Sequence, residues 1–223
     1  MRINGLSLII SMATRELNDP LINHYEKAII LGAFREDVWY IPGVKSVIEH
    51  LSLSHFYGSG LPGGFFPFLW PGARAKSNRF HARAVNHFRA GNKAAAFVQL
   101  GRAAHLLADM ACPVHVHRVV HETDPYEWFI EGNRARLLAL PAVRSQTEPK
   151  RASDLIEAMS RFTESFESDK TNSPHGRLLR RLGARSILTR ETVAAQAEKI
   201  IPVAAGHTAA LFQLFLRRAG KRA

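Results

Sequence analysis

The segment HLLADMACPVH, residues 105–115, carries three side chains of types that bind metals. It follows AAAFVQLGRAA, an apolar run typical of a helix. His105 and Asp109 are four residues apart, so a helix would present both on one face. His115 follows Pro113, which ends the helix and lets the chain fold back over the same face. Because imidazole and carboxylate groups are ligands of zinc and similar divalent ions, the pattern predicts a metal site.

The simpler interpretation of His105 and Asp109 is an ion pair on a helix, but three features favour metal binding. Ala and Leu surround the pair, which predicts burial, and a buried carboxylate needs strong compensation. No thiol is expected to compete, so the predicted ligands are nitrogen and oxygen atoms. Further residues of ligand type follow soon after in the sequence: His117, His121, Glu122, Asp124 and Glu127. Far upstream, the predicted loop offers three more, Asp37, His50 and His55.

Helical patterns dominate the rest of the chain and must position these residues. The pair Asp19-Pro20 is a typical helix start, and Gly32 is predicted to end that helix. The last segment, residues 189–223, is apolar on one face, and Pro202 should kink or split it. We find no alternating strand pattern, internal repeat or linker. The sequence therefore predicts an all-α fold in a single domain over residues 1–223.

A long stretch rich in Gly, Pro and aromatic residues, at about 37–75, interrupts the helical patterns. A connection of this length inside a compact domain is usually functional or disordered. Its aromatic residues argue against disorder, so we expect an active-site loop there.

The composition limits the classes of protein and partner. The 223 residues, 46% of them hydrophobic, suffice for one sizeable core, and the single cysteine, Cys112, excludes an internal disulfide. The net charge of +11 favours anionic partners such as phosphate groups, lipid headgroups or nucleic acid. No uninterrupted apolar run approaches the ~20 residues that span a membrane. The N-terminus does not resemble a signal peptide, so the chain as written is expected to be cytoplasmic.

These features resemble the zinc-dependent phospholipases C of bacteria, relatives of the fungal zinc-dependent single-strand nucleases. FVQLGRAAHLLADMACPVHVH is similar to the family's helix with its His, its Asp and, after a Pro, a second His. LSHFYG resembles its SHFYD segment, GAFRED the stretch with its early aspartate, and GHTAALFQLFL its C-terminal helix. The resemblance runs from about residue 25 to the end. It implies an all-helical domain with a cluster of zinc ions in a cleft.

The resemblance also implies which residues bind zinc. Carried over to this sequence, the ligands of one ion are Asp37, His55, His105 and Asp109. Those of a second ion are His115, Glu127 and a histidine, for which His121 is the candidate. Because His121 lies six residues before Glu127 rather than the family's four, Asp124 is the alternative ligand. His117 is expected to face solvent.

Two zinc ions are expected, because the family's third site needs an N-terminal Trp amine and a His in the first helix. This chain begins with Met1, and its first histidine, His24, falls in the second predicted helix as an expected surface residue. Gly58 replaces the last aspartate of SHFYD, which is not among the carried-over ligands. Either two metals suffice, or the sequence starts late and lacks the beginning of a precursor of a family that is often secreted.

The implied activity is hydrolysis of phosphate esters, in which Asp37 both holds metal and accepts the proton of the attacking water. The expected substrate is the headgroup phosphodiester of a phospholipid, because the segment DPYE favours the phospholipase branch over the nuclease branch. Loop aromatics would contact the lipid surface, stack on nucleobases of single strands, or only pack on the helices: Phe56, Phe65, Phe66, Phe68 and Trp70. A degenerate, non-catalytic metal-binding protein is the third alternative.

Overall fold

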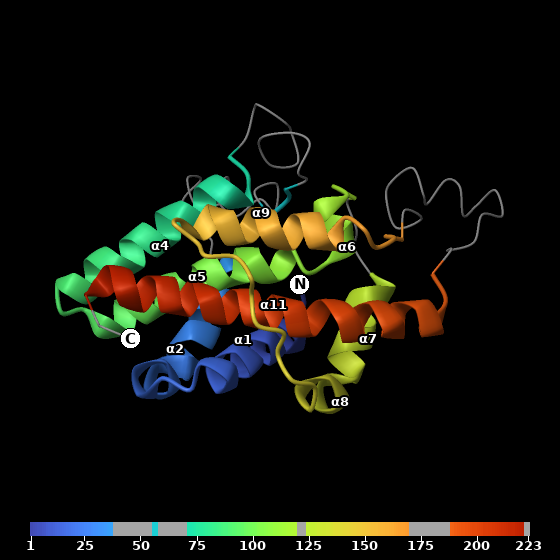
Figure 1. The fold of residues 1–223 in the computed structure, drawn as a ribbon, viewed down its shortest axis with the longest axis horizontal. Coiled ribbons are helices and arrows are strands. Elements are labelled where there is room, and N and C mark those ends of the chain that lie inside the picture. The colour runs from blue at the N-terminus through green and yellow to red at the C-terminus, as the bar shows by residue number, and fades with distance from the viewer. Residues whose placement is uncertain (38–54, 58–70, 120–123, 170–187, 221–223) are drawn as a thin grey trace.

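The computed structural model describes residues 1–37, 55–57, 71–119, 124–169 and 188–220. Within these ranges every regular element is a helix, which confirms the predicted all-α class. Figure 1 shows α11 crossing the middle of the view, with α1 and α2 below it and α4 and α9 above it. The helices are α1 (Ile3–Leu17), α2 (Pro20–Asp37), α4 (Ala73–Arg89), α5 (Lys93–Asp109), α6 (Pro113–Val116), α7 (Pro125–Gly132), α8 (Arg134–Leu138), α9 (Ala152–Thr163) and α11 (Arg190–Ala219).

Helix α5, which carries the HLLAD motif, packs directly on α2 because two glycines remove side chains from the contact. A Cβ atom at Gly32 would lie 2.0 Å from the carbonyl oxygen of Val98, and one at Gly101 would lie 1.9 Å from that of Ile29. No side chain tolerates such distances, so the two backbones touch. The prediction that Gly32 ends α2 is therefore wrong, since the helix continues to Asp37 and this glycine serves close packing.

Helix α11 runs through Pro202 as one helix, so of the two predicted effects of this proline, a kink or a split, the split is wrong and the kink stays a prediction. The carbonyl oxygen of Pro202 accepts a hydrogen bond of 2.9 Å from the backbone N–H of Val143. Gly206 makes this approach possible, because a Cβ atom there would lie 1.7 Å from the carbonyl oxygen of Val143. The irregular segment 141–149 thus lies against the backbone of α11.

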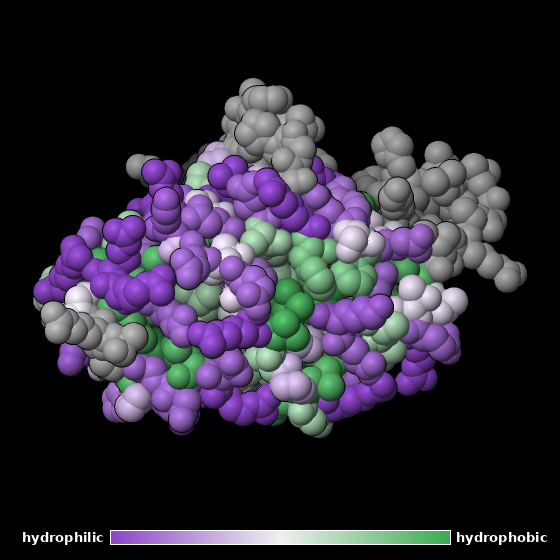
Figure 2. Space-filling model, viewed as in Figure 1, coloured by the Kyte–Doolittle hydropathy of each residue, from purple (hydrophilic) through white to green (hydrophobic). Residues whose placement is uncertain are grey.

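Helix α11 is also, within the described part of the chain, the one helix with the length and apolar composition of a membrane span. However, 78% of that window is buried inside the molecule, as in the core helix of a bundle. In the view of Figure 2, hydrophilic residues cover most of the surface, and apolar residues show as smaller patches, one of them near its centre. Most charged side chains thus lie at the surface. A few are buried, and several of these meet near the C-terminal ends of α2 and α5.

Candidate metal centre

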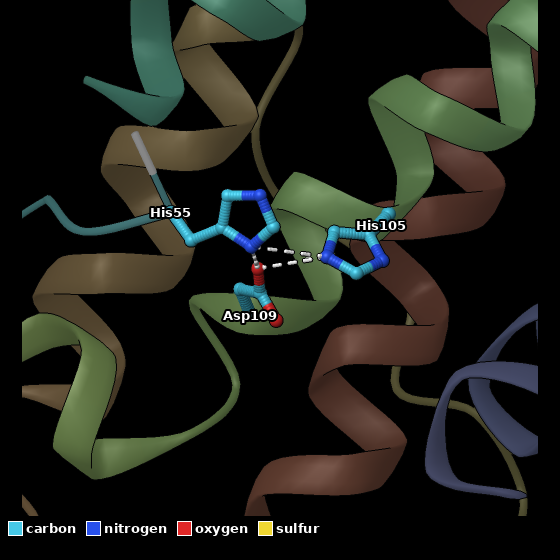
Figure 3. A group of neighbouring side chains, drawn as sticks. All are labelled: His55, His105 and Asp109. Atoms are coloured by element: carbon cyan, nitrogen blue, oxygen red, sulfur yellow. Dashed lines mark hydrogen bonds and ion pairs between the residues drawn. The ribbon is translucent and has the colours of Figure 1, made fainter. Parts of the chain in front are cut away.

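The last turn of α5 and the segment 55–57 bring three ligand atoms together. His105 and Asp109 are fully buried, and His55 is 2% exposed. The Oδ2 atom of Asp109 lies 2.9 Å from Nδ1 of His55 and 3.1 Å from Nε2 of His105. The two nitrogens are 3.2 Å apart. Figure 3 shows the two rings and the carboxylate converging on one point between them.

This triangle has the dimensions of a metal site. Four ligands at about 2.0–2.1 Å from a tetrahedral zinc ion lie about 3.4 Å from one another. The three distances in the cluster are close to this value, and hydrogen bonds could satisfy at most the two pairs that include Oδ2 of Asp109, which leaves the contact between the two ring nitrogens unexplained. Oδ2 of Asp109 is buried and accepts no well-formed hydrogen bond. The residues therefore fit a divalent cation of the zinc type.

The turn after α5 returns the chain to the same place. The carbonyl oxygen of Asp109 accepts a hydrogen bond of 2.9 Å from the N–H of Cys112, and Pro113 then starts the short helix α6. His115 in α6 places its Nε2 atom 3.9 Å from Oδ1 of Asp109, while its Nδ1 atom lies 3.2 Å from the carbonyl oxygen of His55. A proline after a helix thus aims a third imidazole at the carboxylate, as the spacing predicts.

A second group of ligand atoms adjoins the first and consists of Cys112, His115 and Glu127. Their candidate ligand atoms all lie within 4.8 Å of one another, and all three side chains are buried. Glu127 comes from the first turn of α7, where the Asp124 carboxylate caps the helix by accepting a hydrogen bond from the N–H of Tyr126. A thiol thus lies among the candidate ligand atoms, whereas the sequence led us to expect that none would compete for metal. The sequence motif itself contained a signal for this thiol, since Cys112 directly precedes the proline that turns the chain.

Other predicted residues have different outcomes. His117 is exposed and its ring lies 2.8 Å from the carbonyl oxygen of Phe166, which confirms that it does not join the cluster. Phe56 is buried with its ring stacked on His115, so of the three alternatives for the loop aromatics this residue takes the third, packing inside the protein. Asp37 is the last residue of α2, but its side chain lies outside the described part. Residues that lie wholly outside it are His50, Gly58, Phe65, Phe66, Phe68, Trp70, His121 and Glu122.

The amino group of Met1 also reaches the centre, and sequence reasoning gave it no place there. It lies 2.5 Å from Oδ1 of Asp109 and 3.2 Å from Oε1 of Glu127. Together with three imidazoles, this group sets the charge of Asp109. Burial by itself raises the pKa of Asp109, but His105, the Met1 amine, His115 and His55 hold that pKa well below its ordinary value. Asp109 is thus a buried anion, as a metal ligand must be.

A buried ion-pair cluster supports His55 from the side opposite Asp109. Glu36 is 1% exposed, and its carboxylate lies 2.5 Å from Nζ of Lys76 and 2.7 Å from Nε of Arg102. Its Oε1 atom is 3.8 Å from Nε2 of His55. Burial raises the pKa of Glu36, but His55, Lys76, Arg102 and His105 hold it well below the usual carboxyl range. A carboxylate behind a histidine ligand fixes the ring and raises its basicity.

Fold and centre together define an all-helical protein with a buried cluster of imidazole and carboxylate groups suited to a divalent cation. The chain belongs to the zinc-dependent phospholipase C family, whose family model, described as zinc dependent phospholipase C, matches residues 7–168. This confirms the predicted family, a class of phosphodiester hydrolases, and makes zinc the cation that the donor set accommodates.

Solved structures agree with this assignment at the level of the fold. Alpha-toxin of an avian strain of Clostridium perfringens is similar with a TM-score of 0.69 and 14% identity, over 98% of this chain and 64% of that one. Alpha toxin from Clostridium absonum is similar with a TM-score of 0.70 and 16% identity, over 100% of this chain and 67% of that one. The chain thus spans about two thirds of the length of each toxin. No curated protein matches its sequence.

Proposed function

We propose that this chain is a zinc-dependent phospholipase C that hydrolyses the headgroup phosphodiester of phospholipids. The observation that carries the proposal is the convergence of His55, His105 and Asp109 on one point, beside a second group of buried ligand atoms. Two adjacent donor groups support the proposal of two zinc ions, a number that suits phosphate ester hydrolysis. The products are diacylglycerol and a phosphorylated headgroup.

When bound, zinc polarises the phosphoryl oxygens and lowers the pKa of water toward ~7. The chain supplies the positioning. Asp109, ionised and buried, holds the rings of His55 and His105 in one orientation. Asp37, at the end of α2 beside Glu36, is the proposed general base that takes the proton of the attacking water. His115 and Glu127, together with the predicted ligand His121, are the proposed ligands of the second zinc ion.

We also propose that the substrate is met at a membrane surface. Trp128 directly follows Glu127 in α7 and is 52% exposed, and the guanidinium of Arg2 lies 3.6 Å from the centre of its ring. An indole next to a cation suits the boundary between lipid and water. Binding to phosphatidylcholine vesicles should weaken in Trp128→Ala, while hydrolysis of a short-chain, monomeric phospholipid should not change.

A substrate panel tests the function. The zinc-loaded chain should release phosphocholine from phosphatidylcholine, lose that activity to a chelator, and regain it on addition of zinc. Single-stranded DNA serves as the competing substrate, and Asp109→Asn as the inactive control. Hydrolysis of DNA alone would make the phospholipase assignment wrong, and zinc binding without hydrolysis of either substrate would contradict an enzymatic role.

A further inference from the structure

Cys112 occupies a fixed position between the two helices that carry the histidine ligands. Its backbone N–H donates to the carbonyl oxygen of Asp109 at the end of α5, and the next residue, Pro113, begins α6. The residue is fully buried, and its backbone lies in the extended region at the start of α6. The hydrogen bond to α5 on one side and the start of α6 on the other therefore fix the backbone of Cys112, and with it the direction of the side chain.

That direction points the sulfur into the second ligand group. Sγ of Cys112 lies within 4.8 Å of ligand atoms of both His115 and Glu127. On its other side, Sγ is 3.3 Å from Oδ2 of Asp124, whose Oδ1 atom caps α7. Because this helix cap holds the Asp124 side chain in place, its carboxylate keeps a fixed position next to Sγ.

We propose that the thiolate of Cys112 binds the second zinc ion together with His115 and Glu127. This inference deepens the proposed function and rests on it. On binding, the S–H bond breaks, the proton leaves to solvent, and a sulfur–zinc bond of about 2.3 Å forms. A sulfur, a nitrogen and an oxygen donor then come from three consecutive elements: the turn after α5, then α6, then α7.

The charges of the group agree with this arrangement. Without a metal ion the sulfur is a thiol: its S–H group donates to Oδ2 of Asp124, and burial with the carboxylates of Glu127 and Asp124 raises the pKa of Cys112. The Met1 amine, 3.2 Å from Oε1 of Glu127, offsets part of the negative charge, and a bound zinc ion would stabilise the thiolate in place of the thiol proton. The sulfur also changes which cations fit. Thiolate is a soft ligand that selects zinc and related ions, whereas magnesium and calcium prefer oxygen atoms. The second position should therefore discriminate against magnesium and calcium more strongly than a site of nitrogen and oxygen atoms.

Cobalt(II), a spectroscopic substitute for zinc, tests the inference in the full chain. Cys112 is the only cysteine, so a thiolate-to-cobalt charge-transfer band in the near ultraviolet can arise from this residue alone. We expect the band to appear with the second equivalent of cobalt. In Cys112→Ser it should be absent, the second equivalent should bind at least tenfold more weakly, and the first should be unchanged. Circular dichroism of the variant provides the control for folding.

The outcomes separate this inference from the proposed function. A wild-type chain that binds two equivalents of cobalt and hydrolyses phospholipid in its zinc form, but shows no charge-transfer band, would overturn the role of Cys112 alone. A chain that binds no cobalt and hydrolyses no phospholipid would overturn both. Because the wild-type spectrum decides the first question, the test does not depend on whether Cys112→Ser folds.

Discussion

The substitution Glu36→Gln tests whether the ion-pair cluster behind His55 supports the metal centre. It removes one buried negative charge and keeps the volume of the side chain. Lys76 and Arg102 then face a neutral amide in a buried site, and loss of one partner of a buried ion pair costs about 3–5 kcal/mol of unfolding free energy. Loss of the carboxylate behind a histidine ligand typically lowers metal affinity by about 10–100-fold.

Two measurements separate these effects. Urea unfolding followed by circular dichroism gives the free energy of unfolding, and competition with a chromophoric chelator gives the zinc affinity. Glu157→Gln is the matched control, because Glu157 pairs with Arg74 and Arg161 in a partly exposed position. Such surface pairs contribute only about 0–1 kcal/mol, and this one does not contact the predicted ligands. The control should therefore leave both quantities nearly unchanged.

The pH dependence gives a third measurement. Because the pKa of folded Glu36 is held well below its ordinary value of 4.5, the carboxylate contributes stability above that value and loses it as the pH falls below it. Wild-type stability should thus fall more steeply in acid than that of Glu36→Gln. If the folded variant kept wild-type zinc affinity, Glu36 would have no part in orienting His55. If the variant does not fold, the double variant Glu36→Gln/Lys76→Met removes the unpaired ammonium and allows the same comparison.

Three further predictions follow from the same geometry. Asp109→Asn should bind zinc at least tenfold more weakly, as elemental analysis after dialysis would measure, and should unfold at a lower urea concentration. Full metal content together with wild-type turnover would refute the assignment of Asp109 as a ligand. Gly101→Ala should cost about 1–3 kcal/mol or more in urea unfolding, because its Cβ would overlap backbone, whereas Gly132→Ala, with open space around it, should be nearly neutral. Burial and the charge of Arg218 lower the pKa of His81 from 6.5 to about 4. As the pH falls, the unfolded chain therefore takes up this proton before the folded chain does. The free energy of unfolding of the wild type should fall by about 3 kcal/mol as the pH drops from 6.5 to about 4. His81→Gln should flatten this fall, and identical pH profiles would contradict it.

Much of the centre could be predicted because its residues are close in sequence. The spacing of His105 and Asp109 places them on one helix face by geometry, and the proline turn brings in His115. The place of His55 in the cluster depends on tertiary structure, and only the resemblance to the family indicated it. The family itself and the all-α fold are confirmed, whereas the ligand roles stay predictions until metal binding is measured.

The errors share a physical cause, which is that local patterns do not report packing. Gly32 has the features of a helix end, but it is needed because another backbone touches it. Cys112 was expected not to compete for metal, although it stands in the metal-binding motif and the turn after α5 brings it beside His115 and Glu127. Glu36 is one residue before a predicted ligand and has no local signal of burial, since Lys76 and Arg102 reach it from two other helices.

The first ligand group joins one local and one distant contact, and this has a consequence for how the chain folds. His105 and Asp109 meet within one helical turn, whereas His55 is 50 residues from His105. Closing a loop of that length costs about 3–4 kcal/mol of chain entropy. Zinc that arrives during folding can therefore stabilise the end of α5 early and act as a cross-link to His55 only later. The refolding rate should therefore rise with zinc concentration. It should level off once packing of the helices, rather than formation of the zinc link between His55 and α5, limits the rate.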